Sequence, residues 1–302
     1  MSAVPHTLEV PQRSRLREYY ELTKPRVVML IMFTAIVGMF LSVEGLPPLN
    51  RLLWGSLGIA LQAASAAAIN QMLDRHVDAR MARTCGRPLV TGTLSLPEST
   101  IFAGALGIGG FAVLYLWVNP LSAWLTLATL IGYAGIYTVF LKRATPQNIV
   151  IGGAAGAAPP VLGWVAITGH VDPEALLLFL IIFIWTPPHF WALAIEREKE
   201  YAKVNIPMLP VTHGIEFTRT QVLLYTLLLL AVSVLPFVFG MSGLLYLAGA
   251  LVFGGVFLAY AWRLKFAPVP GLPMKTFGYS IVYLMAIFAL LLLDHYRFAI
   301  WS

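Results

Sequence analysis

The sequence has 302 residues, of which 59% are hydrophobic and 11% are charged, and its formal net charge at pH 7 is +6. Soluble domains carry about 25% charged residues, so this composition excludes a soluble globular protein and indicates a polytopic membrane protein. The single cysteine, Cys85, excludes an internal disulfide and a cysteine-rich metal site.

Nine apolar stretches are long enough to cross the roughly 30 Å hydrocarbon layer of a bilayer as α-helices. We therefore predict an all-α fold, a bundle of nine transmembrane helices that forms one membrane domain over residues 26–302. A polar and basic segment, 1–25, precedes it and lacks the features of a cleavable signal peptide. The expected spans lie near 26–43, 52–71, 98–118, 121–140, 148–168, 174–195, 219–239, 243–262 and 277–294.

Basic residues are confined to alternate connections between these spans. If the N-terminus is cytoplasmic, all of the 20 lysines and arginines except Arg51 and Arg297 fall on the cytoplasmic side. The positive-inside rule therefore predicts a cytoplasmic N-terminus and an outward C-terminus. The same distribution explains the net positive charge without a nucleic-acid partner. Two connections on the predicted cytoplasmic side, 72–97 and 196–218, are unusually long.

The stretch Asn70–Pro88 carries polar side chains at helical spacing after the second apolar run. Asn70, Asp74 and Asp78 are spaced i, i+4, i+8, so they share one face of a helix. Carboxylates one turn apart repel each other and therefore need a cation. Mg²⁺ is commonly held by one or two carboxylates together with substrate phosphates, and the nearby arginines can donate to phosphate oxygens. The stretch predicts ionisation of a diphosphate. The alternative is a solvated helix end that pairs with its arginines.

A second acidic pair follows the sixth apolar stretch. Glu196 and Glu200 are also one turn apart, but Arg197, Lys199 and Lys203 alternate with them. The pattern is therefore compatible with a second metal-binding face or with a salt-bridged amphipathic helix.

Paired prolines mark two neighbouring spans. We expect Pro159–Pro160 and Pro187–Pro188 to interrupt their helices and to form part of a cavity wall. His189 follows the second pair in an apolar setting. It is either a hydrogen-bonded core residue or a ligand of a metal or haem iron.

The N-x-x-x-D-x-x-x-D spacing resembles the first motif of the UbiA-type intramembrane prenyltransferases. Enzymes that transfer phospho-alcohol groups from CDP-linked lipids have a glycine where this sequence has Asn70. Within the UbiA-type proteins, four further blocks resemble the haem O synthase family. They are L-T-K-P-R at Leu22–Arg26, the run Leu141–Trp164, T-P-P-H-F-W at Thr186–Trp191, and E-Y-A-K-V-N-I-P-M-L-P at Glu200–Pro210.

The resemblance implies a bundle around a central cavity, capped by the two long loops, in a bacterial inner membrane with the active site facing the cytoplasm. The implied reaction transfers the farnesyl group of farnesyl diphosphate to a vinyl group of haem B, with addition of water, and yields haem O and diphosphate. Haem A synthase or a haem-copper oxidase assembly protein is an implied partner. A quinone or chlorin acceptor, and a haem transporter or assembly factor without catalysis, are the alternatives.

The resemblance also distributes roles among the candidate residues. Mg²⁺ is the implied cofactor, with Asp74, Asp78 and Glu200 as ligands and Asn70 beside them. Glu200 takes this role better than Glu196, because only the acidic residue before the tyrosine is regular in haem O synthases. The implied diphosphate ligands are Arg83, Arg87, Lys142 and Lys203, and His189 is the candidate haem ligand.

Overall fold

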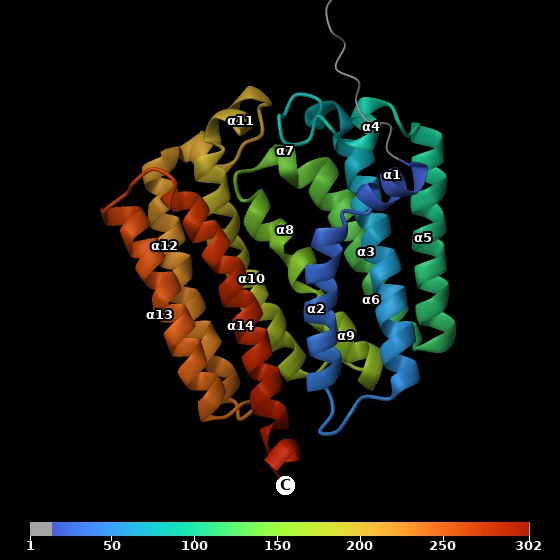
Figure 1. Cartoon of the computed structure of the whole chain (residues 1–302), viewed down its shortest axis with the longest axis vertical. Helices are drawn as coiled ribbons and strands as arrows, with labels where there is room; N and C mark the ends of the chain where they lie inside the picture. Colours follow the sequence, from blue (N-terminus) through green and yellow to red (C-terminus); the bar gives the residue numbers. More distant parts are fainter. Residues whose placement is uncertain (1–13, 302) are drawn as a thin grey trace, which may run out of the picture.

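The computed structural model describes residues 14–301, and every regular element within this range is helical (Figure 1). Residues 1–13, which make up much of the predicted N-terminal segment, and residue 302 lie outside the described part. In the first half of the chain the elements are α1 (Arg15–Leu22), α2 (Pro25–Leu41), α3 (Leu49–Asp78), α4 (Pro88–Thr91), α5 (Leu96–Trp117), α6 (Pro120–Ile131), the π-helix η1 (Gly132–Leu141) and α7 (Lys142–Ala144). The second half contains α8 (Asn148–Ala157), α9 (Pro159–Thr168), α10 (Pro173–Glu196), α11 (Glu198–Lys203), α12 (Leu209–Val238), α13 (Leu244–Phe266) and α14 (Leu272–Trp301).

The predicted all-α membrane fold is confirmed. In the described range, 8 helical segments are long and apolar enough to cross a membrane, and α1 with α2 forms a bent pair that brings the number to 9. The clearest difference from the expected spans is in α3, which continues from the apolar run through Asp78. The acidic residues of the first motif therefore lie on a continuous helix, as their spacing predicts, although the expected span ends near residue 71.

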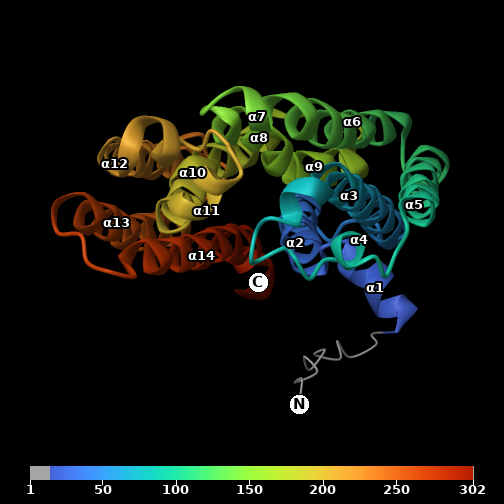
Figure 2. The same cartoon turned by 90° about the horizontal axis from the view of Figure 1, so that it is seen from above.

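The long helices run between two ends of the bundle, and the short helices α1, α4, α7 and α11 gather at one of them (Figure 1). We call this the α11 end. Seen from above, α2, α3, α5, α6 and α9 lie in one half of the molecule, and α10, α12, α13 and α14 lie in the other (Figure 2). At the opposite end, α14 is joined to the end of α2. His295 Nε2 donates to the Val43 carbonyl at 3.0 Å, and the Tyr296 hydroxyl donates to the Phe40 carbonyl at 2.9 Å.

The two proline pairs behave differently. Pro159 begins α9 after α8 has ended at Ala157, so the first pair interrupts its span as predicted. The prediction was wrong for Pro187 and Pro188, which lie inside a continuous α10. The Thr186 hydroxyl donates to the Ile182 carbonyl at 2.8 Å in this region. Such hydroxyl donors help membrane helices to tolerate proline, because they bond carbonyls near the missing N–H.

The break between α8 and α9 is followed by very close packing of α9 on α2. A Cβ atom on Gly163 would lie 2.0 Å from the Ala35 carbonyl oxygen, so only glycine fits at this contact. Small residues of this kind let membrane helices approach closely. The packing fixes α2, and with it the N-terminal end of α2 that forms one wall of the site.

Candidate functional site

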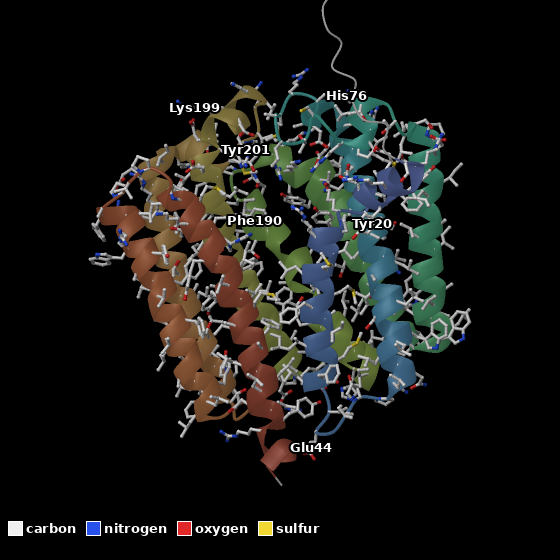
Figure 3. The ribbon with its side chains drawn as sticks, viewed as in Figure 1. Tyr20, Glu44, His76, Phe190, Lys199 and Tyr201 are labelled. Atoms are coloured by element: carbon white, nitrogen blue, oxygen red, sulfur yellow. The ribbon has the colours of Figure 1, made fainter. Side chains whose placement is uncertain are left out.

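A cavity of about 770 Å³ opens at the α11 end of the bundle. Its walls come from α1, α2, α3, η1, α7, α8, α10 and α11, and from the loops between them. Tyr20, Phe190 and Tyr201, which Figure 3 labels in the upper half of the molecule, mark three of these walls. The cavity combines charged residues with tyrosines and aliphatic side chains, as expected of a site that accepts both a polar head and an apolar body.

The last turns of α3 supply the acidic part of the cavity. Asn70, Asp74 and Asp78 all line it, as the sequence predicted, and each is at most 5% exposed. Carboxylates are unfavourable at the C-terminal end of a helix, where the helix dipole is negative. Their burial at this position requires cations nearby, because an unpaired buried charge is costly.

Two predicted residues provide these cations. Lys142 Nζ lies 2.6 Å from Asp74 Oδ2, and Arg87 Nη1 is paired with Asp78 Oδ2. Arg87 reaches α3 because the chain turns back after Asp78, and the Thr84 hydroxyl holds that turn by donating to the Asp78 carbonyl at 2.9 Å. The structure thus brings together residues that are far apart in the sequence.

Lys24 is a site residue that the sequence analysis missed. It lines the cavity and donates from Nζ to Asn70 Oδ1. Its backbone is in the left-handed region, with φ 51°, directly before Pro25. Left-handed backbone is uncommon for a residue other than glycine, and such strain gathers at functional sites. Burial is the main cause that lowers the pKa of Lys24 to about 7, and the positive charges of Arg87 and Lys142 act in the same direction.

The Asn70 amide connects Lys24 with the rest of the site. Its Nδ2 donates to Asp74 Oδ2 at 3.1 Å and to Thr138 Oγ1 at 3.0 Å. Because Lys24 donates to the amide oxygen, the amide nitrogen must face the carboxylate. Thr138 belongs to η1, and its hydroxyl also donates to the Tyr133 carbonyl at 2.9 Å.

The π-helix η1 contributes an aromatic wall. Tyr133 and Tyr137 line the cavity, and their rings stack with centroids 5.6 Å apart. A Cβ atom on Gly152 of α8 would lie 2.2 Å from the Tyr137 ring, so this glycine makes room for the stack. π-Helical turns are frequent at functional sites. The i, i+4 spacing of the two tyrosines was a visible signal, but aromatic pairs at helical spacing are equally common in cores.

The carboxylates keep oxygen atoms for a cation. The ion pairs of Asp74 and Asp78 use Oδ2, and Asp74 Oδ1 is buried with no hydrogen-bond partner among the described residues. A buried unsatisfied acceptor costs about 1–3 kcal/mol, so it indicates a missing partner. Oxygen donors of this kind fit Mg²⁺.

The structure does not bring the predicted third metal ligand to this cluster. In the described range, no group of three or more histidine, cysteine, aspartate or glutamate residues is arranged to hold a metal ion. Glu200 instead pairs with Arg197 of its own segment at 3.1 Å, and it is not among the cavity-lining residues. The amphipathic salt-bridged helix, which the sequence left open, describes this segment better than a second metal face.

Of the other predicted residues, some line the cavity and some do not. Arg83 is a lining residue, whereas Lys203 is exposed and lies outside the lining. His189 is buried and is not among the cavity-lining residues. It stacks against Trp185 and Phe277, with Nδ1 2.6 Å from Ser280 Oγ. Its Nε2 has no hydrogen-bond partner among the described residues.

Comparisons with known proteins agree with this geometry. The UbiA prenyltransferase family matches residues 31–289 of the chain. The protoheme IX farnesyltransferase of Methylococcus capsulatus is 62% identical over 280 residues, which are 93% of this chain and 94% of the relative. The protoheme IX farnesyltransferase of Idiomarina loihiensis is 55% identical over 295 residues, or 98% of this chain and 99% of the relative.

Solved structures share the fold at low sequence identity. A digeranylgeranylglyceryl phosphate synthase superposes with a TM-score of 0.79 at 19% identity, covering 93% of this chain and 99% of that one. A UbiA homologue from Archaeoglobus fulgidus, bound to DMAPP and Mg²⁺, superposes with a TM-score of 0.65 at 20% identity, covering 91% and 99%. The chain therefore belongs to the UbiA prenyltransferase family, in the group of the protoheme IX farnesyltransferases.

Proposed function

We propose that the protein transfers the farnesyl group of farnesyl diphosphate to a vinyl group of haem B, with addition of water, to form haem O and diphosphate. The observation that carries this proposal is the buried Asp74–Asp78 pair with its surrounding cations, in a chain 62% identical to a protoheme IX farnesyltransferase. The A. fulgidus UbiA homologue, which shares the fold, binds DMAPP and Mg²⁺.

The diphosphate head binds at the mouth of the cavity. Asp74 and Asp78 would hold Mg²⁺, which would neutralise negative charge that accumulates on the diphosphate as the C–O bond breaks. Lys142, Arg87 and Lys24 donate hydrogen bonds to its oxygens, and Arg83 joins them from the loop after α3. These donors are fixed in place before the reaction, which is the arrangement that stabilises developing charge most effectively.

The farnesyl chain continues into the apolar part of the cavity. Loss of diphosphate leaves an allylic cation, and the stacked Tyr133 and Tyr137 supply aromatic faces that can stabilise a cation by about 1–2 kcal/mol. The vinyl group of haem B attacks this cation to form the new C–C bond. Water then adds to the carbon next to the porphyrin and loses a proton, which gives the hydroxyl group of haem O.

The most direct test uses membranes that contain the protein, supplied with farnesyl diphosphate, Mg²⁺ and haem B. Separation of the haems should show haem O with the unmodified protein and far less with Asp78→Asn at equal abundance. Prenylation of an added quinone in place of haem would contradict the choice of acceptor. Haem uptake without release of diphosphate would indicate a transporter.

We also propose that the α11 end, and with it the site, faces the cytoplasm of a bacterial inner membrane. The single cysteine, Cys85, is exposed in the loop after α3 and makes this testable without added mutations. A membrane-impermeant maleimide should label Cys85 in inverted vesicles and leave it unlabelled in intact spheroplasts. A Glu44→Cys, Cys85→Ser protein should show the opposite pattern, because Glu44 lies at the other end of the bundle (Figure 3).

A further inference from the structure

The cavity contains more positive charge than its carboxylates and a diphosphate require. Five lysines and arginines line it, against three carboxylates. Arg87 and Lys142 are paired with aspartates, and Lys24 is bonded to Asn70. A diphosphate bound to Mg²⁺ retains only a small net negative charge, so part of this positive surplus remains. The remaining positive charge can bind a second anionic group in the same cavity.

Arg26 is a cavity-lining cation outside the contacts of the Asp74–Asp78 cluster. It lies in the first turn of α2 and has neither an ion pair nor a hydrogen bond from its side chain within the described range. Asp74 and Asp78 pair with Lys142 and Arg87 instead. The cluster therefore leaves Arg26 free to bind an anion of the substrate.

Exposed apolar side chains line the cavity on both α2 and α10. Val27 and Met29 of α2 are 53% and 61% exposed, and Phe190 of α10 is 40% exposed, although all three line the cavity. The cavity thus combines the Arg26 cation on α2 with apolar side chains from two helices. A flat amphipathic molecule with carboxylates on one edge fits such an arrangement.

We infer that Arg26 binds a propionate of the haem acceptor, while Val27, Met29 and Phe190 contact the porphyrin face. This inference rests on the proposed function. The vinyl and propionate groups of haem B lie on opposite edges of the ring. A vinyl group beside the allylic carbon therefore requires a propionate anchor on another cation than those paired with Asp74 and Asp78, and we assign this anchor to Arg26. Arg26 then selects a porphyrin carboxylate and orients the reacting vinyl group.

The test compares haem B with its dimethyl ester, in which both propionates are uncharged. The unmodified protein should prefer haem B by roughly 10- to 100-fold in KM, the effect of one hydrogen bond to a charged group. Arg26→Gln should raise KM for haem B by this factor, leave KM for farnesyl diphosphate unchanged, and lose the preference over the ester. Arg26→Lys, which keeps the charge, should retain part of the preference. Lys199→Gln, which removes an exposed charge outside the cavity, is the matched control.

Titration of the Soret band with haem B and with the ester measures the same preference without turnover. It therefore separates failure of the inference from failure of the proposed function. Equal affinity of Arg26→Gln and the unmodified protein for haem B, with the preference over the ester intact, would overturn the inference. Arg26 would then be a charge of the membrane surface. An unmodified protein that prefers haem B in binding but forms no haem O would instead contradict the proposed reaction.

Discussion

The end of α3 and the segment α10–α11 look alike in the sequence but differ in the structure. Each is an apolar helix followed by acidic residues one turn apart with basic residues nearby. At the end of α3, Asp74 pairs with Lys142, which lies 68 positions later in the sequence. Asp78 pairs with Arg87, which lies 9 positions later, beyond the end of the helix. In α11, Glu200 pairs with Arg197 only three positions earlier.

The difference shows that the position of the basic partners in the chain distinguishes a binding site from a helix stabilised by its own ion pairs. A local ion pair at i, i+3 supports the helix that contains it and is satisfied by that helix alone. A cation from another segment, such as Lys142, can reach a carboxylate only if the intervening chain is ordered, which costs conformational entropy. Here such cations surround carboxylates that are buried. The end of α3 therefore has the character of a binding site, and α11 has that of a surface helix.

The largest effect is expected at the end of α3. Asp74→Asn and Asp78→Asn should each lower kcat/KM for haem O formation by about 10²–10³-fold, the typical cost of losing one charge-stabilising group in a transition state. Excess Mg²⁺ should restore part of the activity, because each variant keeps one of the two carboxylates. Haem chromatography over a range of Mg²⁺ concentrations measures both effects. Full activity in either variant would contradict the metal assignment.

Substitution of His189 tests whether α10 binds the haem acceptor and not the diphosphate. Nδ1 is bonded to Ser280, and ligating histidines typically have their other nitrogen held in this way. The ring is however buried between Trp185 and Phe277 and is not among the cavity-lining residues. If Nε2 ligates the haem iron, His189→Ala should weaken haem B binding and shift the Soret band, with unchanged KM for farnesyl diphosphate. Ser280→Ala, which retains the imidazole, should show a smaller shift. An unchanged Soret band in His189→Ala would assign His189 to the core.

Lys24 tests the diphosphate side with pH as the variable. A lysine binds the anion only when protonated, and the pKa of Lys24 is lowered to about 7. The kcat/KM for farnesyl diphosphate should therefore fall as the pH rises above about 7, since kcat/KM reports the free enzyme. Lys24→Arg should lack this decrease because arginine stays charged, and Lys24→Met should lose about tenfold at lower pH. Identical pH profiles for the unmodified protein and Lys24→Arg would exclude this role.

The fold and half of the site follow from patterns within single segments. Apolar runs define the spans, and the i, i+4, i+8 spacing places Asn70, Asp74 and Asp78 on one face. Lys24 was not predictable in the same way. A lysine before a span is a typical orientation signal, and its inward direction depends on a left-handed backbone and on contact with α3. Glu200 was expected at the metal, and its pairing with Arg197 was the less favoured alternative, because spacing alone does not determine the path of the segment that follows a span.

Glu200 provides the smallest expected effect and the sharpest contrast between the two regions. Its pair with Arg197 is partly exposed, and exposed pairs of this kind contribute only about 0.3–0.5 kcal/mol to stability. Because Glu200 also does not line the cavity, Glu200→Gln should leave kcat/KM and the Mg²⁺ dependence nearly unchanged. A tenfold loss of apparent Mg²⁺ affinity would contradict this expectation. It would mean that α11 moves onto the metal when the diphosphate binds, and that the two acidic segments serve one site after all.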